Sequence, residues 1–221
     1  MDGETFRGHI EAAKATLAET VAQGKDFAPM VMVIRGGRMV AQVIPGTGDG
    51  GNVAKVARVA AASFGADELL LVNDTYMASG ETRLNPVTGK EWQHGDMANL
   101  VEHHRGLERG FVVEAITVFN TGHGVADHLV SLPYKRLERG RVEWLSPHDM
   151  EDGREDQELR GGRFAGLFAG LTPEMRVPDP IAALLLGRME ALVALAFFKD
   201  ETDPIMLALK SDIDSGKLRT M

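Results

Sequence analysis

The chain has 221 residues, of which 44% are hydrophobic and 25% are charged, and this balance suits one domain with a sizeable buried core. Its formal net charge of −8 disfavours contact with phosphate backbones, so a nucleic-acid partner is not expected. There is no cysteine, which excludes disulfides, thiolate catalysis and cysteine-ligated metal centres.

The first third of the chain predicts two helices separated by a β-hairpin. The first helix spans about residues 4–23, because apolar side chains recur there every three or four positions. Two β-rich runs, 30–34 and 39–44, flank a Gly-Gly pair and predict a tight hairpin. A glycine-rich loop over 45–51 then leads into a second helix over about 52–64.

A central strand, a long loop and further strands are predicted next. The continuous apolar run at 69–72 is typical of a strand covered on both faces, and the strand should end at Asn73-Asp74. Residues 75–95 show no period and predict a long loop, which in a compact domain is often functional. The elements expected after it are a helix over about 96–108, strands at 111–119 and 125–134, and a hairpin joining 134–137 to 142–145.

This order of elements, α-β-β-α-β-α-β-β-β, mixes hairpins with at least one helical crossover. It predicts an α+β, or mixed α/β, fold with a three-layer core and a mixed sheet. We expect this core domain to occupy residues 1–147.

The last third of the chain has a different composition. Residues 148–160 carry six acidic residues and two arginines, and they predict an acidic linker over 148–162. Beyond the linker, residues 163–221 predict a C-terminal helical segment, because the Asp-Pro-Ile sequences at 179–181 and 203–205 each supply an N-cap and a first-turn proline.

Neither end of the chain predicts a membrane segment. The N-terminus is charged from its second residue and resembles no signal peptide, so we expect a cytoplasmic protein. The apolar run 181–198 is interrupted by Arg188 and Glu190, which favours a buried or interface helix over a membrane span. Such a helix must pack on the core or on another subunit, so a homo-oligomer formed through the C-terminal helices is expected.

One glycine pattern is a candidate nucleotide site. The pattern Gly46-x-Gly48-x-x-Gly51 follows a predicted strand and precedes a helix, whose N-terminus would favour a pyrophosphate. Against this interpretation, Asp49 places a negative charge in the loop, and the alternative is a flexible turn rich in glycine.

Histidines gather in the middle of the chain, and three residues there form a candidate metal site. His94 and Asp96 lie at the start of a predicted helix, and His123 lies in a predicted turn. Imidazole and carboxylate ligands suit zinc, manganese or iron. The alternative is a set of structural histidines, since no H-E-x-x-H or H-x-H pattern occurs.

A third candidate site lies just after the central strand, where sheets of this class often bind ligands. Its expected ligand-binding residues offer an acid, two aromatic rings, a guanidinium and an imidazole: Asp74, Tyr76, Arg83, Trp92 and His94. Trp92 could stack on a ligand and Arg83 could pair with an anion. The alternative is a capping aspartate and a loop anchored by one tryptophan.

The segments LLLVNDTYM (69–77), NPVTGKEW (85–92) and HGDM (94–97) resemble uncharacterised α/β proteins of actinobacteria and their phages. The resemblance covers about residues 28–120 and implies a bacterial or phage cytoplasmic setting. It implies no function and no catalytic residue.

Two functions remain open at this point. The first is an accessory module that binds a partner or a small ligand and assembles through its C-terminal helices. The second is a small-molecule enzyme that uses a nucleotide or a bound metal. An enzyme predicts that Asp74, His94 and His123 converge within about 12 Å, since catalytic groups act at hydrogen-bond reach, whereas a module predicts dispersed histidines.

Overall fold

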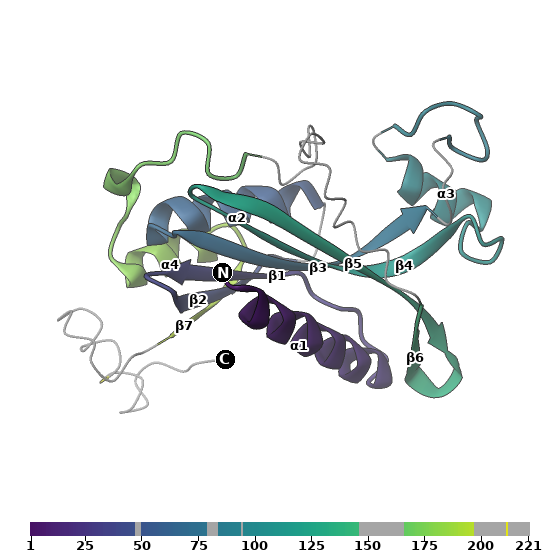
Figure 1. Ribbon diagram of the computed structural model, residues 1–221, viewed down its shortest axis with the longest axis horizontal. Coiled ribbons are helices and arrows are strands. Elements are labelled where there is room, and N and C mark those ends of the chain that lie inside the picture. Colours follow the sequence, from purple (N-terminus) through teal and green to yellow (C-terminus); the bar gives the residue numbers. More distant parts are fainter. Residues whose placement is uncertain (47–49, 79–83, 94, 146–165, 197–210, 212–221) are drawn as a thin grey trace.

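The structure, a computed structural model, describes residues 1–46, 50–78, 84–93, 95–145, 166–196 and 211. Within these residues the chain forms one seven-stranded sheet with helices on both faces, as Figure 1 shows. The predicted α+β class is confirmed. The strands are β1 (Met30–Arg35), β2 (Arg38–Ile44), β3 (Glu68–Ala78), β4 (Val112–Gly122), β5 (Val125–Leu137), β6 (Arg141–Trp144) and β7 (Leu192–Leu195).

The strands lie in the order β6-β5-β4-β3-β1-β2-β7, and every pairing among the described strands is antiparallel. The expectation of a mixed sheet is therefore wrong. A helical crossover does join β2 to β3, which run in the same direction. However, β1 lies between them and pairs with both, so the two parallel strands never meet.

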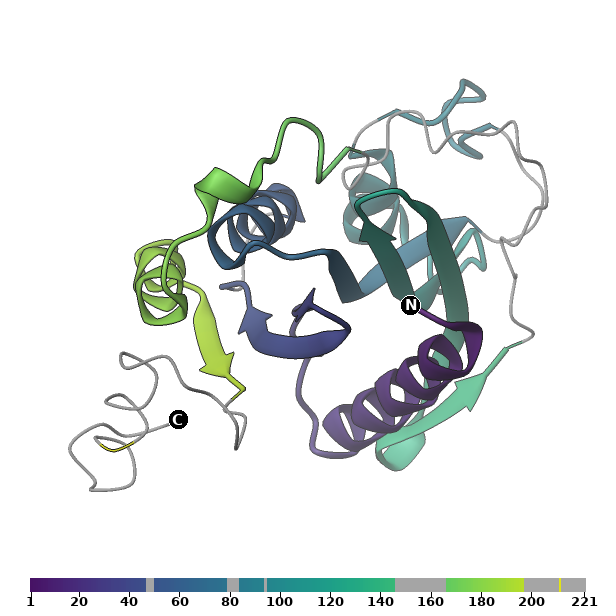
Figure 2. The ribbon, with the colours of Figure 1, turned by 60° about the vertical axis from the view of Figure 1, so that its left-hand side comes forward.

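Helices cover the two faces unequally. The helix α1 (Gly3–Ala22) lies on one face, with the Asp2 carboxylate accepting a hydrogen bond from the Thr5 N–H as its N-cap. On the other face lie α2 (Gly50–Phe64) and, beside it near β7, α4 (Asp179–Gly187), as Figures 1 and 2 show. The short α3 (Asp96–His104) sits at the far end of the sheet, next to β3. None of the described helices is long and apolar enough to cross a membrane.

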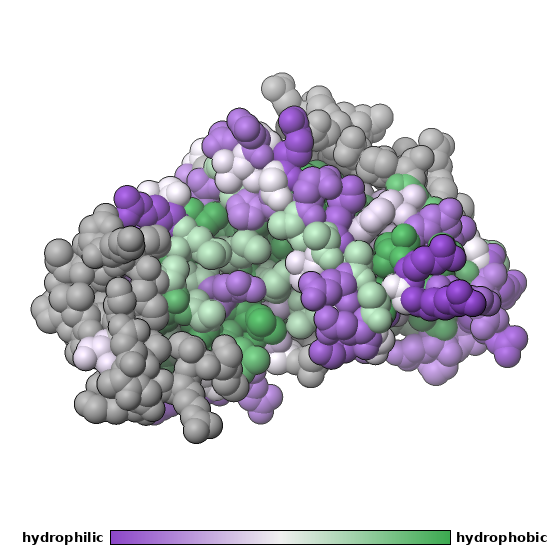
Figure 3. Space-filling model, turned by 90° about the horizontal axis from the view of Figure 1, so that it is seen from below, coloured by the Kyte–Doolittle hydropathy of each residue, from purple (hydrophilic) through white to green (hydrophobic). Residues whose placement is uncertain are grey.

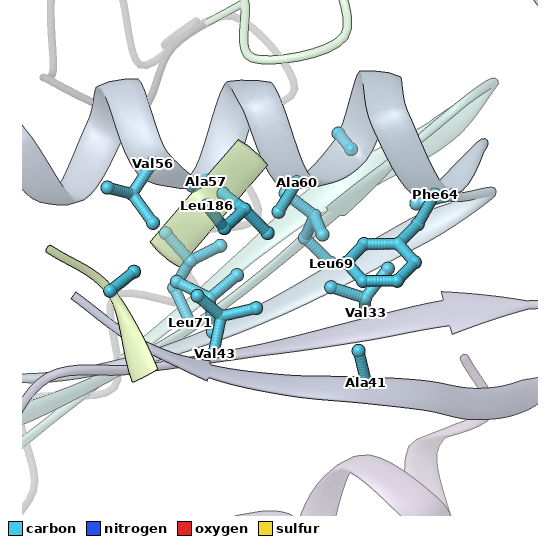
Figure 4. Close-up of a cluster of buried hydrophobic side chains, with 14 of the residues drawn as sticks. Val33, Ala41, Val43, Val56, Ala57, Ala60, Phe64, Leu69, Leu71 and Leu186 are labelled. Atoms are coloured by element: carbon cyan, nitrogen blue, oxygen red, sulfur yellow. The ribbon is translucent and has the colours of Figure 1, made fainter. Parts of the chain in front are cut away.

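The sheet separates two apolar clusters. Leu69 and Leu71 point toward α2, whereas Leu70 and Val72 point toward α1, so the apolar run of the central strand is buried on both faces as predicted. Figure 4 shows the α2 side of the sheet. There α2 contributes small residues and one ring that pack on the strands and on α4: Val56, Ala57, Ala60 and Phe64 against Val33, Ala41, Val43 and Leu186.

The C-terminal third differs from its prediction. The helix expected through 181–198 is wrong, because α4 ends at Gly187 and the chain then forms β7, which pairs with β2. Glu190 turns the chain with a positive φ of 62°, and the open edge of β2 supplies hydrogen-bond partners that a longer helix would not use. The predicted linker at 148–162 and the helix start at 203–205 lie outside the described residues.

Candidate functional site

The central strand is longer than its apolar run. Asp74 was expected at the strand's end, but β3 continues to Ala78, and Asp74 pairs with Ile116 on β4. The prediction that the strand ends at Asn73-Asp74 is therefore wrong. Thr75 and Tyr76 favour extended backbone, and β4 offers an equally long partner. As a result, Asp74 faces neighbours on the sheet instead of a loop.

Three carboxylates surround a single guanidinium at this part of the sheet, and we refer to the four side chains as the Arg136 cluster. The Arg136 Nε lies 2.9 Å from Glu114 Oε1, and Arg136 Nη2 lies 3.3 Å from Asp74 Oδ2. The third acid, Asp26, comes from the segment after α1 and lies 3.6 Å from Arg136 Nη1. The side chains of Asp74 and Glu114 are only 20% and 17% exposed, whereas that of Asp26 is fully exposed.

Two tyrosines frame the cluster. The hydroxyl of Tyr134, a buried residue, donates to the Asp74 carboxylate, with 3.0 Å to each oxygen. Tyr76 pairs with Glu114 across β3 and β4, and Glu114 pairs in turn with Tyr134 on β5. This register places the side chains in one row on the α1 face of the sheet. Tyr76 is 38% exposed, so its ring remains open to a ligand.

The cluster carries more negative charge than its arginine neutralises. Burial raises the pKa of Asp74 above its ordinary value, although the Tyr134 hydrogen bond and the Arg136 charge oppose this. Burial likewise raises the pKa of Glu114, against the lowering effect of Arg136. With all three acids ionised, the cluster has a formal charge of −2. A proton or a second cation would therefore be favoured here.

The structure brings together only part of the predicted ligand site. Asp74 and Tyr76 lie at the Arg136 cluster, and Trp92 is a half-buried residue of the loop before α3. Arg83 and His94 lie outside the described residues.

The sequence pattern did not identify four members of the site: Asp26, Glu114, Tyr134 and Arg136. A signal existed, because Tyr134 and Arg136 are two positions apart and therefore share a strand face. The register that places Glu114 beside them depends on strand pairing, which the sequence pattern does not specify.

The Asn85 loop forms a turn that is hydrogen-bonded to α3. The Asn85 side-chain oxygen accepts hydrogen bonds from the Val87 and Thr88 backbone N–H groups, at 2.9 and 3.3 Å. Its amide nitrogen donates to Asp96 at 2.9 Å. This bond and one from the Gln93 N–H hold the pKa of Asp96 below its ordinary value. Asp96 therefore ties the loop to the first turn of α3.

The proposed metal ligands do not converge among the described residues. Asp96 begins α3, near the end where β4 starts, and His123 follows the other end of β4. Since β4 has 11 residues, about 30 Å of strand separates these two ends. His123 is exposed and its ring meets the edge of Phe168 with 4.7 Å between centroids. In the part of the chain that the structure describes, no group of three or more His, Asp or Glu residues could hold a metal ion.

Asp74 and His123 are also far apart. His123 follows Gly122, which pairs with Glu68 at the opposite end of β3 from Asp74. Six strand residues correspond to about 20 Å, which exceeds the separation that an acid–base pair tolerates. His94 lies outside the described residues, so the position of the third group is not described.

The glycine loop has a packing explanation at its first position. A Cβ on Gly46 would lie 2.9 Å from the Glu190 carbonyl oxygen, because the chain after β2 passes directly beside the turn between α4 and β7. Gly51 lies in the first turn of α2, and Gly48 lies outside the described residues. The antiparallel sheet also lacks the two parallel halves of dinucleotide-binding folds.

Cavities among the described residues lie elsewhere. One of about 190 Å³ opens between the start of α1 and the β1–β2 hairpin, and its walls include His9, Met32, Met39 and Glu68. A second, of about 30 Å³, lies beneath the Asn85 turn. Neither of these two cavities is lined by Asp74 or Tyr76.

Comparison of the chain with protein-family models, with curated proteins and with solved structures finds no match.

Proposed function

We propose that this chain is a cytoplasmic accessory binding module that recognises a protonated amine or a guanidinium group at the Arg136 cluster. The observation that carries the proposal is the excess of carboxylates, of which Asp74 and Glu114 are mostly buried beside a single arginine. A ligand cation would neutralise charge that the described residues leave unbalanced. The half-exposed ring of Tyr76 adds an aromatic surface, which cations also favour.

The dispersion of the candidate catalytic groups supports a module rather than an enzyme. Asp74 lies far from His123, and Asp96 makes hydrogen bonds that stabilise its own loop. The ligand group could belong to a free small molecule or to a lysine or arginine side chain of a partner. Both sources offer the same chemistry to the cluster.

The test is an NMR titration with N-acetyl-arginine methylamide and N-acetyl-lysine methylamide. The matched probe is N-acetyl-citrulline methylamide, which keeps the shape of arginine without its charge. We expect the two cationic probes to shift the signals of Tyr76 and Arg136 saturably, and citrulline to leave them unchanged. Binding of citrulline as tight as that of arginine would contradict the proposal.

Variants connect the binding to the cluster. The double substitution Asp74→Asn with Glu114→Gln removes two negative charges and should weaken arginine binding at least tenfold, or by about 1.4 kcal/mol. The control is Glu102→Gln, which removes an exposed charge on α3. Unchanged binding in the double variant would place the cation elsewhere. Affinity that rises with the number of arginines in a peptide would indicate a protein partner as the source of the cation.

The alternative function is a small-molecule enzyme. It draws support from the raised pKa values of Asp74 and Glu114, because carboxylates of this kind serve as general acids. In this alternative a nucleotide binds the loop at 46–51. A thermal-shift screen with NAD, NADP and ATP tests it, since a ligand at a hundredfold excess over its Kd stabilises the fold by about 2.7 kcal/mol. A shift that Gly48→Val abolishes would favour the enzyme, and no shift would contradict it.

A further inference from the structure

The two edges of the sheet are built differently. At the edge strand β6, Arg141 and Glu143 are exposed, and such charges on an edge prevent another strand from pairing with it. At the opposite edge, the sequence of β7 is Leu-Val-Ala-Leu, and it contains no charged residue and no proline. An alanine precedes the strand and another follows it. Its inner side pairs with β2, and no strand that the structure describes pairs with its outer side.

Exposed aliphatic side chains surround the unprotected edge. Leu192 on β7 is 50% exposed, and α4 adds three exposed residues: Ile181 at 45%, Leu184 at 70% and Leu185 at 40%. The inward face of α4 packs on the core, where Ala182 and Leu186 are buried. Figure 2 places α4 and β7 together at one end of the molecule. Figure 3, from the α1 side, shows hydrophobic residues gathered toward this end.

Residues 181–196, which include most of α4 and all of β7, carry no net formal charge, and Asp179 at the start of α4 forms an ion pair with Arg35. The whole chain has a net charge of −8, but residues 181–196 contain only one positive and one negative side chain, Arg188 and Glu190. Two acidic molecules repel each other over most surfaces, whereas two of these surfaces would meet without net repulsion. A neutral, aliphatic surface beside a strand edge that no described strand pairs with is complementary to itself.

We propose that β7 and α4 form the interface of a homodimer in which the partner is a second copy of this chain. The two β7 strands pair antiparallel about a two-fold axis, which joins the two sheets into one and supplies partners to the outer backbone groups of each strand. The same axis brings the exposed leucines of the α4 helices into one apolar contact. This interface is independent of the Arg136 cluster, which lies on other strands.

The first measurement is the mass of the full-length protein by sedimentation and light scattering at several concentrations. We expect a dimer that dissociates on dilution. Leu184→Asp should shift the mass toward the monomer because it places a charge in the apolar contact between the two α4 helices. Leu192→Lys should do the same because it places a charge beside the paired β7 strands, on the opposite face of the sheet from α4. The matched control is Leu107→Asp, since Leu107 is similarly exposed, at 40%, but lies between α3 and β4. The control variant should remain a dimer.

A second measurement does not depend on destabilising variants. Because the chain has no cysteine, Ala194→Cys introduces a single thiol on β7, and a short bismaleimide should link two chains through it. Glu143→Cys on the β6 edge should give no such product.

Three results would overturn the proposal. They are a full-length chain that is monomeric at every concentration, equal cross-linking at both edges, and a monomer whose β7 amides resist hydrogen exchange. In the last case the edge would be covered by the chain itself.

Discussion

At the scale of single residues, Asp74 shows how burial and pairing compete at one carboxylate. Burial raises its folded-state pKa above the value near 3.8 of an unperturbed aspartate, so the folded protein holds this proton to higher pH than the unfolded chain. The stability from this group is therefore fully present below that value and is lost as pH rises through the folded-state pKa.

Asp74→Asn removes the loss of stability that Asp74 causes as pH rises. The amide oxygen can still accept a hydrogen bond from the Tyr134 hydroxyl. At pH 7 we expect the variant to unfold about 1 to 3 °C higher than the wild type, a shift discounted for partial solvent exposure. Near pH 4 the two proteins should differ less. Thermal unfolding at both values measures this. A variant that is less stable at pH 7 would mean that the Arg136 pairing outweighs the burial of the carboxylate.

Arg136 should contribute more to the stability of the fold than any single acid around it. Arg136→Met leaves three carboxylates near one another without a cation, and we expect the free energy of unfolding to fall by about 1 to 3 kcal/mol at pH 7. Part of the lost stability should be regained near pH 4, where the acids take up protons. Arg136→Lys, which keeps the charge, is the comparison. Urea unfolding of the three proteins at both pH values measures the effect, and a loss that does not depend on pH would indicate packing rather than charge.

At the scale of elements, the buried side-chain amide of Asn85 connects the described part of the loop between β3 and β4 to α3. Asn85 is 4% exposed and bonds both to its own turn and to Asp96 at the start of α3. Asn85→Ala should therefore cost about 1 to 3 kcal/mol locally and speed amide exchange in α3, while β4 and β5 exchange as before. Asn99→Ala, at an exposed position of α3, is the control. Unchanged exchange in α3 would mean that the helix holds its position without the turn.

The elements also show which features a sequence pattern specifies. Local signals were sufficient for the β1–β2 hairpin across Gly36-Gly37 and for the central strand buried on both faces, because periodicity and turn residues act over a few positions. The antiparallel sheet and β7 depended on distant partners. The residues after Gly187 have an apolar composition that fits helix and strand alike, and the free edge of β2 decides between them. The Arg136 cluster was only half predicted for the same reason, since its register spans three strands.

At the scale of the whole molecule, α4 and β7 of the C-terminal segment contribute to the α2-side cluster. Leu186 is fully buried there, whereas Leu184 on the same helix is 70% exposed. If the described residues unfold as one unit, Leu186→Ala should lower the global free energy of unfolding of the monomer by about 2 to 5 kcal/mol. At the same low protein concentration, where the chain is monomeric, Leu184→Ala should change it by less than about 0.5 kcal/mol.

Amide exchange shows whether Leu186→Ala destabilises the whole fold or only the elements near the substitution. Leu186→Ala should speed exchange in α2 and also in α1, which lies on the other face of the sheet from α4. Exchange that increases only in α4 and β7 would instead mean that these elements open separately from the rest of the sheet. The β7 edge would then be presented by a unit that can detach from β2, and dimerisation through it would stabilise the attached state by mass action.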